Sequence, residues 1–112
     1  MPKFLVQGSY SAEGLRGLAK DKATGRQAAV KEAMASLGGK LESLHYALGD
    51  TDVYIVCEFP DHVSAAALSL AASATGLVST KIVTLMTVEE TDRALAMKSG
   101  YRAPGAGKAA KS

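Results

Sequence analysis

The run VYIVCEF at residues 53–59 constrains the fold of this chain more than any other stretch. β-branched and aromatic residues, which favour strands, dominate it. Side chains alternate between the two faces of a strand. One face is wholly apolar and carries Val53, Ile55, Cys57 and Phe59. The other face is mixed and carries Asp52, Tyr54, Val56 and Glu58. This pattern predicts a strand whose apolar face meets helices.

A second strand within residues 40–48 precedes this run, and the sequence GDTD at residues 49–52 predicts a tight turn between them. The length of the turn decides which side chains share a face. A turn of two or four residues adds Leu44, Tyr46 and Leu48 to the apolar face. The same turn adds Ser43, His45 and Ala47 to the mixed face. A three-residue turn would exchange His45 and Tyr46. We favour the first assignment because it collects the apolar residues together.

Helical signals separate the remaining strands. Ser11 is a candidate N-cap, and the pattern is interrupted at residues 21–26, where Gly25 can break or bend the helix. Glycines at 38 and 39 end this first helix. Its expected buried positions are Leu15, Leu18 and Ala19 before the interruption and Val30, Met34 and Leu37 after it. A second, alanine-rich helix begins after Asp61 and ends at Thr75 and Gly76, and the spacing of Thr87 and Glu90 predicts a capping box for a helix over residues 88–98.

The order of these elements predicts the fold class. Strands at residues 3–10 and 78–86 flank the hairpin and the two long helices. The order is β-α-β-β-α-β with an extra C-terminal helix, which is the ferredoxin-like arrangement of the α+β class: one four-stranded antiparallel sheet with helices on one face. The helix-free face is expected to hold Leu5, Leu41, Ala47, Tyr54 and Val56. Such a face is too apolar to stay fully solvated, so we expect a homo-oligomer formed through it.

The segment GGKL, followed by YALGDTDVY, resembles the GYD-domain family. Gly49 and Asp52 fit the Gly-x-Tyr-Asp signature of that family, and Thr51 stands where the signature has tyrosine. The likeness covers roughly residues 1–90. It implies a small ferredoxin-like protein of the kind that forms dimeric α/β-barrels, and it implies little about chemistry.

Composition limits the domain organisation and the partners. The length of 112 residues predicts one domain over residues 1–98 and a disordered basic tail over residues 99–112. The net charge is +2, but Lys98 and the tail hold four basic residues and no acid, which leaves nine basic and eleven acidic residues in the body. A mildly acidic body argues against a nucleic-acid partner. No stretch resembles a signal peptide or a membrane span, so we expect no membrane partner and a cytoplasmic protein.

Polar residues on the mixed face form the candidate site. The possible ligand-binding residues are Ser43, His45, Asp52, Tyr54 and Glu58. His45 and Glu58 are the candidate catalytic base and acid. The alternative reading is that these are ordinary cross-strand and interface polar pairs. No metal-ligand spacing is present and no cofactor is expected. Cys57, the single cysteine, falls on the apolar face and is interpreted as a core residue.

Three functions fit these observations. The first is a homo-oligomer that binds a small ligand at the helix-free face. The second is a cofactor-independent enzyme of the dimeric α/β-barrel type, an oxygenase or isomerase, with His45 as base. The third is a structural or regulatory interaction protein in which the basic tail acts as a tether.

Overall fold

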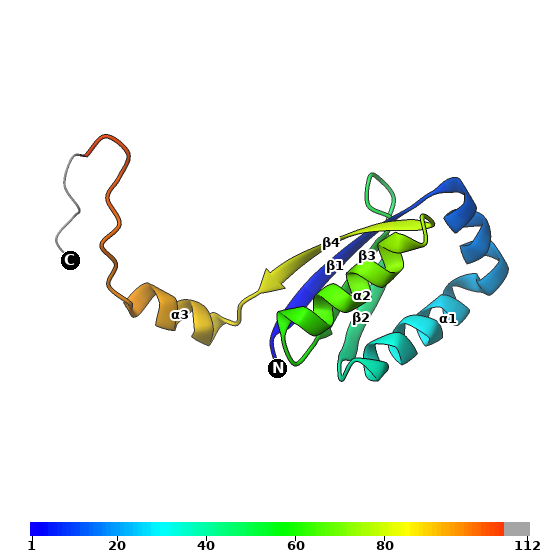
Figure 1. The fold of residues 1–112 in the computed structure, drawn as a ribbon, viewed down its shortest axis with the longest axis horizontal. Coiled ribbons are helices and arrows are strands. Elements are labelled where there is room, and N and C mark those ends of the chain that lie inside the picture. Colours follow the sequence, from blue (N-terminus) through cyan, green and yellow to red (C-terminus); the bar gives the residue numbers. More distant parts are fainter. Residues whose placement is uncertain (107–112) are drawn as a thin grey trace.

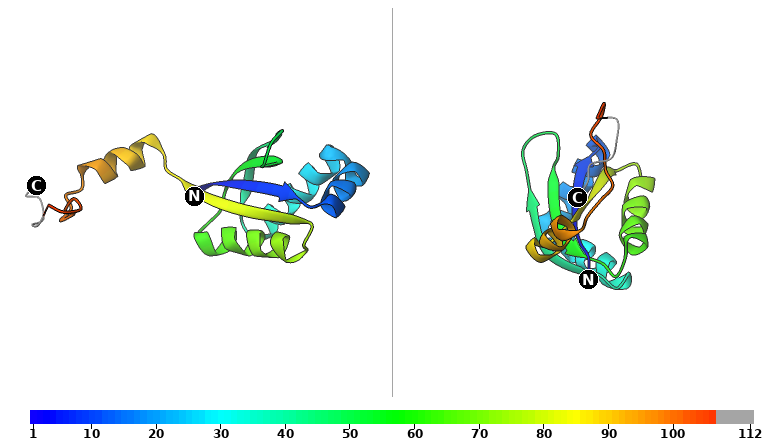
Figure 2. Two further views of the ribbon diagram at one scale, coloured as in Figure 1. Left: turned by 90° about the horizontal axis from the view of Figure 1, so that it is seen from above. Right: turned by 90° about the vertical axis from the view of Figure 1, so that its left-hand side faces the viewer.

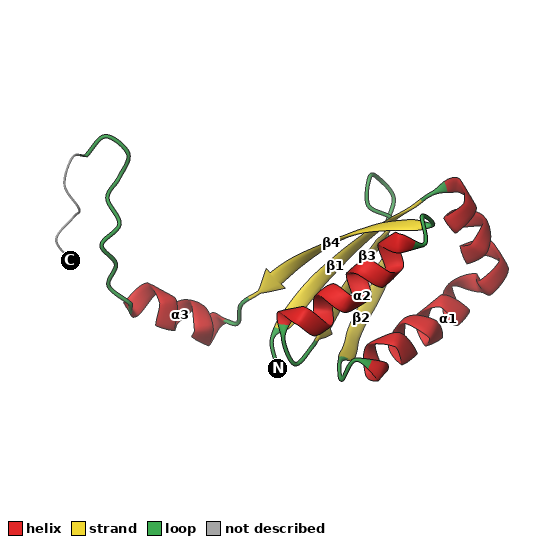
Figure 3. Ribbon diagram, viewed as in Figure 1, coloured by secondary structure: helices red, strands yellow, loops and turns green. Residues whose placement is uncertain are grey.

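The computed structural model describes residues 1–106 and contains one antiparallel sheet with three helices (Figures 1 and 3). The elements in chain order are β1 (Lys3–Tyr10), α1 (Ala12–Ser36), β2 (Lys40–Tyr46), β3 (Val53–Glu58), α2 (His62–Ala74), β4 (Val78–Leu85) and α3 (Val88–Ala96). The strands lie in the order β2-β3-β1-β4, and every neighbouring pair is antiparallel. This confirms the ferredoxin-like α+β fold.

The core lies between one face of the sheet and the two long helices. α1 covers β2 and α2 covers β4. The buried side chains are Phe4, Val6, Met34, Val53, Ile55, Cys57, Phe59 and Ala65. All four apolar-face residues of the run at 53–59 are among them, which confirms the alternation inferred for β3. The rings of Phe4 and Phe59 pack edge to face, with centroids 6.1 Å apart.

Local signals placed the starts of the three helices and the end of α1 correctly. The Ser11 side chain accepts a hydrogen bond from the backbone N–H of Gly14, and Asp61 accepts one from Ser64. Thr87 and Glu90 form the full capping box, in which each side chain accepts a hydrogen bond from the other residue's backbone N–H. α1 ends just before Gly38, which takes a positive φ of 77°.

The expected interruption of the first helix is present, but the break lies at Lys22, with φ 65° and ψ 160°, and not at Gly25. Before the break, the predicted buried residues Leu15 and Ala19 are wrong, since both are exposed. Gly14 is buried in their place. A Cβ at Gly14 would lie 2.0 Å from the carbonyl oxygen of Leu77, so only glycine lets α1 approach this loop. Ser11 donates its backbone N–H to the same oxygen, which fixes the contact.

The hairpin follows the favoured register with two exceptions. Tyr46 pairs with Val53 and Leu44 with Ile55, so the three-residue turn is excluded. Leu48 lies in the connecting loop with its side chain fully exposed, so its predicted place on the apolar face is wrong. Leu41 is also misplaced. A β-bulge between Leu41 and Ser43 inserts an extra residue, which sets Leu41 opposite Cys57 on the helix side of the sheet.

α3 extends beyond the end of the sheet (Figure 2). The molecule measures 59 × 29 × 23 Å, and its radius of gyration is 18.2 Å. A compact chain of about 100 residues has a radius of gyration near 13 Å. No residue of α3 is buried, and the helix ends at Ala96, two residues before the predicted end. Residues 99–106 hold no helix or strand. The rest of the predicted tail, with Lys108 and Lys111, lies outside the described residues.

Candidate functional site

The helix-free face of the sheet carries a central row of apolar side chains. The register sets Leu5 of β1 between Val56 of β3 and Val83 of β4. Ser43 of β2 continues the row at the sheet edge, opposite Val56. Adjacent strands lie about 4.8 Å apart, so these side chains are direct neighbours. Leu5 and Val56 are half-buried and Val83 is 43% exposed. The row is therefore an apolar strip that the molecule's own helices leave uncovered.

A polar row borders this strip on one side. His45 of β2 pairs with Tyr54 of β3, Tyr54 with Gln7 of β1, and Gln7 with Lys81 of β4. The side chains of His45 and Lys81 are exposed, and Tyr54 is 38% exposed. One line across the sheet thus offers an imidazole, a phenol, a carboxamide and an ammonium group. These groups can donate and accept hydrogen bonds to a polar ligand.

An ionic cluster borders the strip on its other side. The Lys3 ammonium lies 2.9 Å from Oε1 of Glu42, the residue in the bulge of β2. Lys3 also pairs in register with Glu58. The hydrogen bond between Lys3 and Glu42 raises the pKa of the lysine and lowers the pKa of the carboxyl group. The N-terminal ammonium of Met1 lies 4.0 Å from Oε1 of Glu58, so Glu58 also takes part in a surface ion pair.

The structure does not bring the two candidate catalytic residues together. His45 lies opposite Tyr54, and Glu58 follows Tyr54 by four residues along β3. At about 3.3 Å per residue, this separates them by roughly 13 Å. A catalytic acid and a catalytic base must each reach the reacting group of the substrate, either by a direct hydrogen bond or through one bridging water. The catalytic roles of His45 and Glu58 stay predictions, but the geometry does not join them in one centre.

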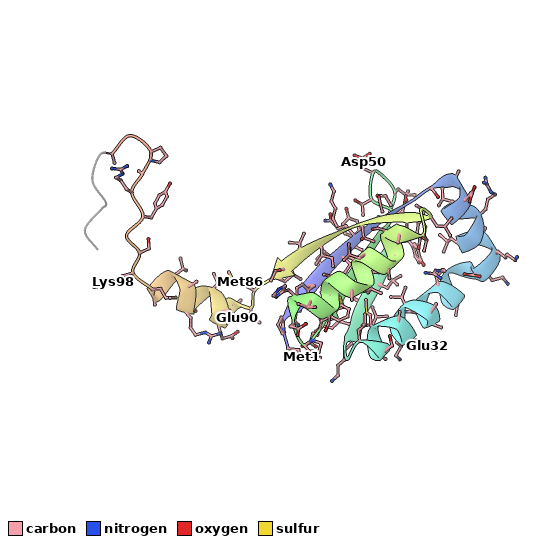
Figure 4. The ribbon with its side chains drawn as sticks, in the orientation of Figure 1. Met1, Glu32, Asp50, Met86, Glu90 and Lys98 are labelled. Atoms are coloured by element: carbon pink, nitrogen blue, oxygen red, sulfur yellow. The ribbon has the colours of Figure 1, made fainter. Side chains whose placement is uncertain are left out.

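Asp52 takes a structural position at the end of the hairpin loop. Its Oδ2 accepts a hydrogen bond of 2.7 Å from the backbone N–H of Tyr10, and its own backbone N–H donates to Gly8. Asp50 lies at the tip of the loop (Figure 4). Its backbone carbonyl accepts a hydrogen bond from the Ser9 hydroxyl. The loop is thereby folded onto the end of β1. A ligand that bound Asp52 would have to share a carboxylate that already accepts a hydrogen bond from the backbone of Tyr10.

Cys57 behaves as a core residue, as interpreted from its position. Its side chain is fully buried, and burial raises the pKa of the thiol to about 11. A protonated thiol is a weak nucleophile. The Sγ lies 3.8 Å from the carbonyl oxygen of Phe4, within reach of a weak hydrogen bond.

Sequence reasoning missed Gln7 and Lys81 of the polar row. Both were assigned to alternating strands, but their membership in one row with His45 depends on how β1 pairs with β3 and β4. The alternation of β1 and β4 was the available signal, since it puts Gln7 and Lys81 on the face opposite Val6 and Ile82. In residues 1–106 no group of three or more His, Cys, Asp or Glu side chains could hold a metal ion. No helix in this described part of the chain has the length and apolar character needed to cross a membrane.

Comparison with known proteins gives a family and nothing finer. Searches of curated proteins and of solved structures find no match to this chain. The family model of the GYD domain matches residues 4–95. That span runs from β1 to the last turn of α3 and includes the hairpin loop with Gly49 and Asp52. The chain therefore belongs to the GYD-domain family.

Proposed function

We propose that this GYD-domain protein is a homo-oligomer that associates through its helix-free sheet face and binds a small polar ligand along the polar row of that face. The observation that carries the proposal is the apolar strip of Leu5, Val56 and Val83 between a polar row and an ionic cluster. An apolar centre with a polar border is the usual anatomy of a protein interface.

Energetics support association through the strip. Full burial of one valine or leucine side chain contributes about 1.5–3 kcal/mol. Leu5 and Val56 are already half-buried, so covering the strip would add only part of this amount for each residue. Even that part is substantial, because a small domain has a total stability of only about 5–15 kcal/mol. The face also carries both signs of charge, at Lys3, Glu42 and Lys81. Two copies of such a face can meet with opposite charges paired, because a two-fold interface uses the same patch twice.

The polar row favours a ligand-binding role over proton-transfer chemistry. It spans about 14 Å across four strands, since strands are spaced about 4.8 Å apart. His45 and Tyr54 offer groups that both donate and accept hydrogen bonds, and Lys81 adds a positive charge. The carboxylate of Glu58, the predicted catalytic acid, does not lie beside His45. A location in the cytoplasm and a tethering role for the basic tail stay predictions.

The test compares the parent chain with Val56→Asp by light scattering at micromolar concentration. The parent is expected to run as an oligomer and the variant as a monomer, because a charge at Val56 would be buried in the interface. Leu70→Asp is the matched control, since Leu70 is 71% exposed on α2, on the other side of the sheet. It should leave the oligomer intact. A parent that runs as a monomer would overturn the proposal.

The same preparations serve for a thermal-shift screen with polar metabolites. A compound that raises the melting temperature of the parent, and no longer does so with His45→Ala, would support binding at the polar row. The ligand part of the proposal would be wrong if no compound stabilised the parent, or if every stabilising compound acted equally on His45→Ala. The association part would then be tested by light scattering alone.

A further inference from the structure

A second candidate site lies on the opposite side of the sheet, between the two long helices. α1 and α2 cover the outer strands β2 and β4 (Figure 1). A cavity of about 120 Å³ remains between the two helices. Its walls are small or aliphatic: Ala29, Val30 and Ala33 of α1 face Leu68 and Ala72 of α2. Gly8 leaves the floor open. A Cβ at Gly8 would lie 2.8 Å from Cγ1 of Val53, so larger residues do not fit there.

Polar groups gather at one end of this cavity. Arg26 of α1 and Tyr10 of β1 line both this cavity and an adjoining one of about 200 Å³. The Arg26 side chain is about one-third exposed. Its Nη1 lies 3.7 Å from Oδ2 of Asp21, which is longer than a hydrogen bond. Asp21 is exposed and lines the adjoining cavity but not this one.

Tyr46 of β2 lies near Tyr10 and Arg26 but lines neither cavity. Partial burial raises the pKa of its hydroxyl, the neighbouring Tyr10 phenol raises it further, and the charge of Arg26 opposes the rise. Tyr46 is therefore neutral at physiological pH and can donate a hydrogen bond. The remaining hydroxyls of the wall, those of Ser69 and Thr80, are already hydrogen-bonded to each other.

We propose that this cavity binds a small monocarboxylic acid, whose hydrocarbon body lies between α1 and α2 and whose carboxylate is held by Arg26 with the hydroxyl of Tyr10. The planar guanidinium matches a carboxylate, which it can hold with two parallel hydrogen bonds. A cavity of about 150 Å³ is enough to bind benzene, so this smaller one suits a hydrocarbon body of about four or five carbon atoms, as in hexanoate. Charge and size together select the ligand, because the walls are apolar and Arg26 is the one charged side chain among the described residues that line the cavity.

The position of this cavity is set by the fold. Both helices are needed to bury one face of the sheet. Each helix leads directly into an outer strand, α1 into β2 and α2 into β4, so each helix lies over that outer strand. Gly14 holds the start of α1 against the loop at Leu77, and the break at Lys22 redirects the helix before Arg26. The second half of α1 then lies over β2, where the small side chains at 29 and 33 face α2 without filling the gap.

The experiment is isothermal titration of the full chain with hexanoate, hexanol and hexylamine, which each have six carbon atoms in total and differ in charge. Hexanoate is expected to bind with saturation, hexanol about tenfold more weakly, and hexylamine not at all, since one charge-assisted contact accounts for about a factor of ten. Arg26→Gln should weaken hexanoate about tenfold and leave hexanol unchanged. Arg16→Gln is the matched control, because Arg16 is an exposed arginine on the same helix and does not line the cavity.

Two further variants separate the cavity from the sheet face. Ala33→Leu and Ala72→Leu fill the cavity from opposite walls and should abolish binding of both hexanoate and hexanol, with folding checked by circular dichroism. Hexanoate that binds equally well to the parent and to a folded filling variant would overturn the proposal, as would equal affinity in Arg26→Gln or the absence of binding at millimolar hexanoate. These results do not depend on the oligomeric state, so they are independent of the test of self-association.

Discussion

At the scale of single residues, the thiol of Cys57 gives a prediction about pH. Burial raises the pKa of this thiol from 9.0 to about 11 in the folded protein. Between these two values the unfolded chain has lost a proton that the folded chain still holds. The stabilisation is therefore present below pH 9 and is lost as pH rises toward 11. A shift of this size corresponds to roughly 2–3 kcal/mol.

The measurement is the free energy of unfolding in urea at pH 8 and at pH 11 for the parent and for Cys57→Ala. The parent is expected to lose more stability than the variant over this interval, although the variant is less stable at pH 8 because it lacks a buried side chain. Tyrosine titration contributes to both chains and cancels in the comparison. Equal losses in the two chains would show that Cys57 does not titrate as described.

Residues that act on their near neighbours in sequence were predictable. The caps at Ser11, Asp61 and Thr87 need only the backbone of the next three residues. Leu15 was misplaced because its exposure depends on Gly14, whose contact with Leu77 joins positions 63 residues apart. Apolar character alone does not reveal that a glycine takes the buried place.

At the scale of elements, the carboxylate of Asp52 joins the hairpin loop to the end of β1. Its hydrogen bond to the backbone N–H of Tyr10 is 2.7 Å long and partly buried. Asp52→Ala leaves that N–H without its charged acceptor, so we expect a loss of about 1–3 kcal/mol in the free energy of unfolding. Asp50→Ala is the control. The contact of Asp50 with Ser9 uses the backbone carbonyl, which alanine keeps, so this variant should stay close to the parent in chemical denaturation. Similar losses in both variants would contradict the role given to Asp52.

Element order followed from the sequence, but the relation between elements followed only in part. The faces of β3 were predictable because alternation is a property of one strand. The bulge that moves Leu41 to the helix side is a property of the pairing of β2 with β3, and no residue pattern in β2 predicts it. The cavity beside Arg26 depends on the distance between two helices, which the sequence of neither helix determines. The polar row was half predicted for the same reason: His45 and Tyr54 belong to one hairpin, whereas Gln7 and Lys81 join through distant pairings.

At the scale of the whole molecule, α3 stands apart from the folded body. It is a nine-residue helix without a buried residue, although its ends are well capped and Leu95 offers an apolar side chain. Isolated helices shorter than about 12–15 residues are marginal in water.

In dilute solution, therefore, the amides of α3 should exchange with solvent hydrogen almost without protection. The amides of β1, which is paired on both sides, should exchange only by opening of the sheet. Hydrogen exchange followed by mass spectrometry checks this on Val56→Asp, the variant expected to be a monomer. Thr87→Ala, which removes the capping box, should change the exchange of α3 little, because a helix that is already mostly open has little left to lose. Protection of α3 equal to that of β1 in the dilute monomer would contradict the picture of a helix without support from its own domain.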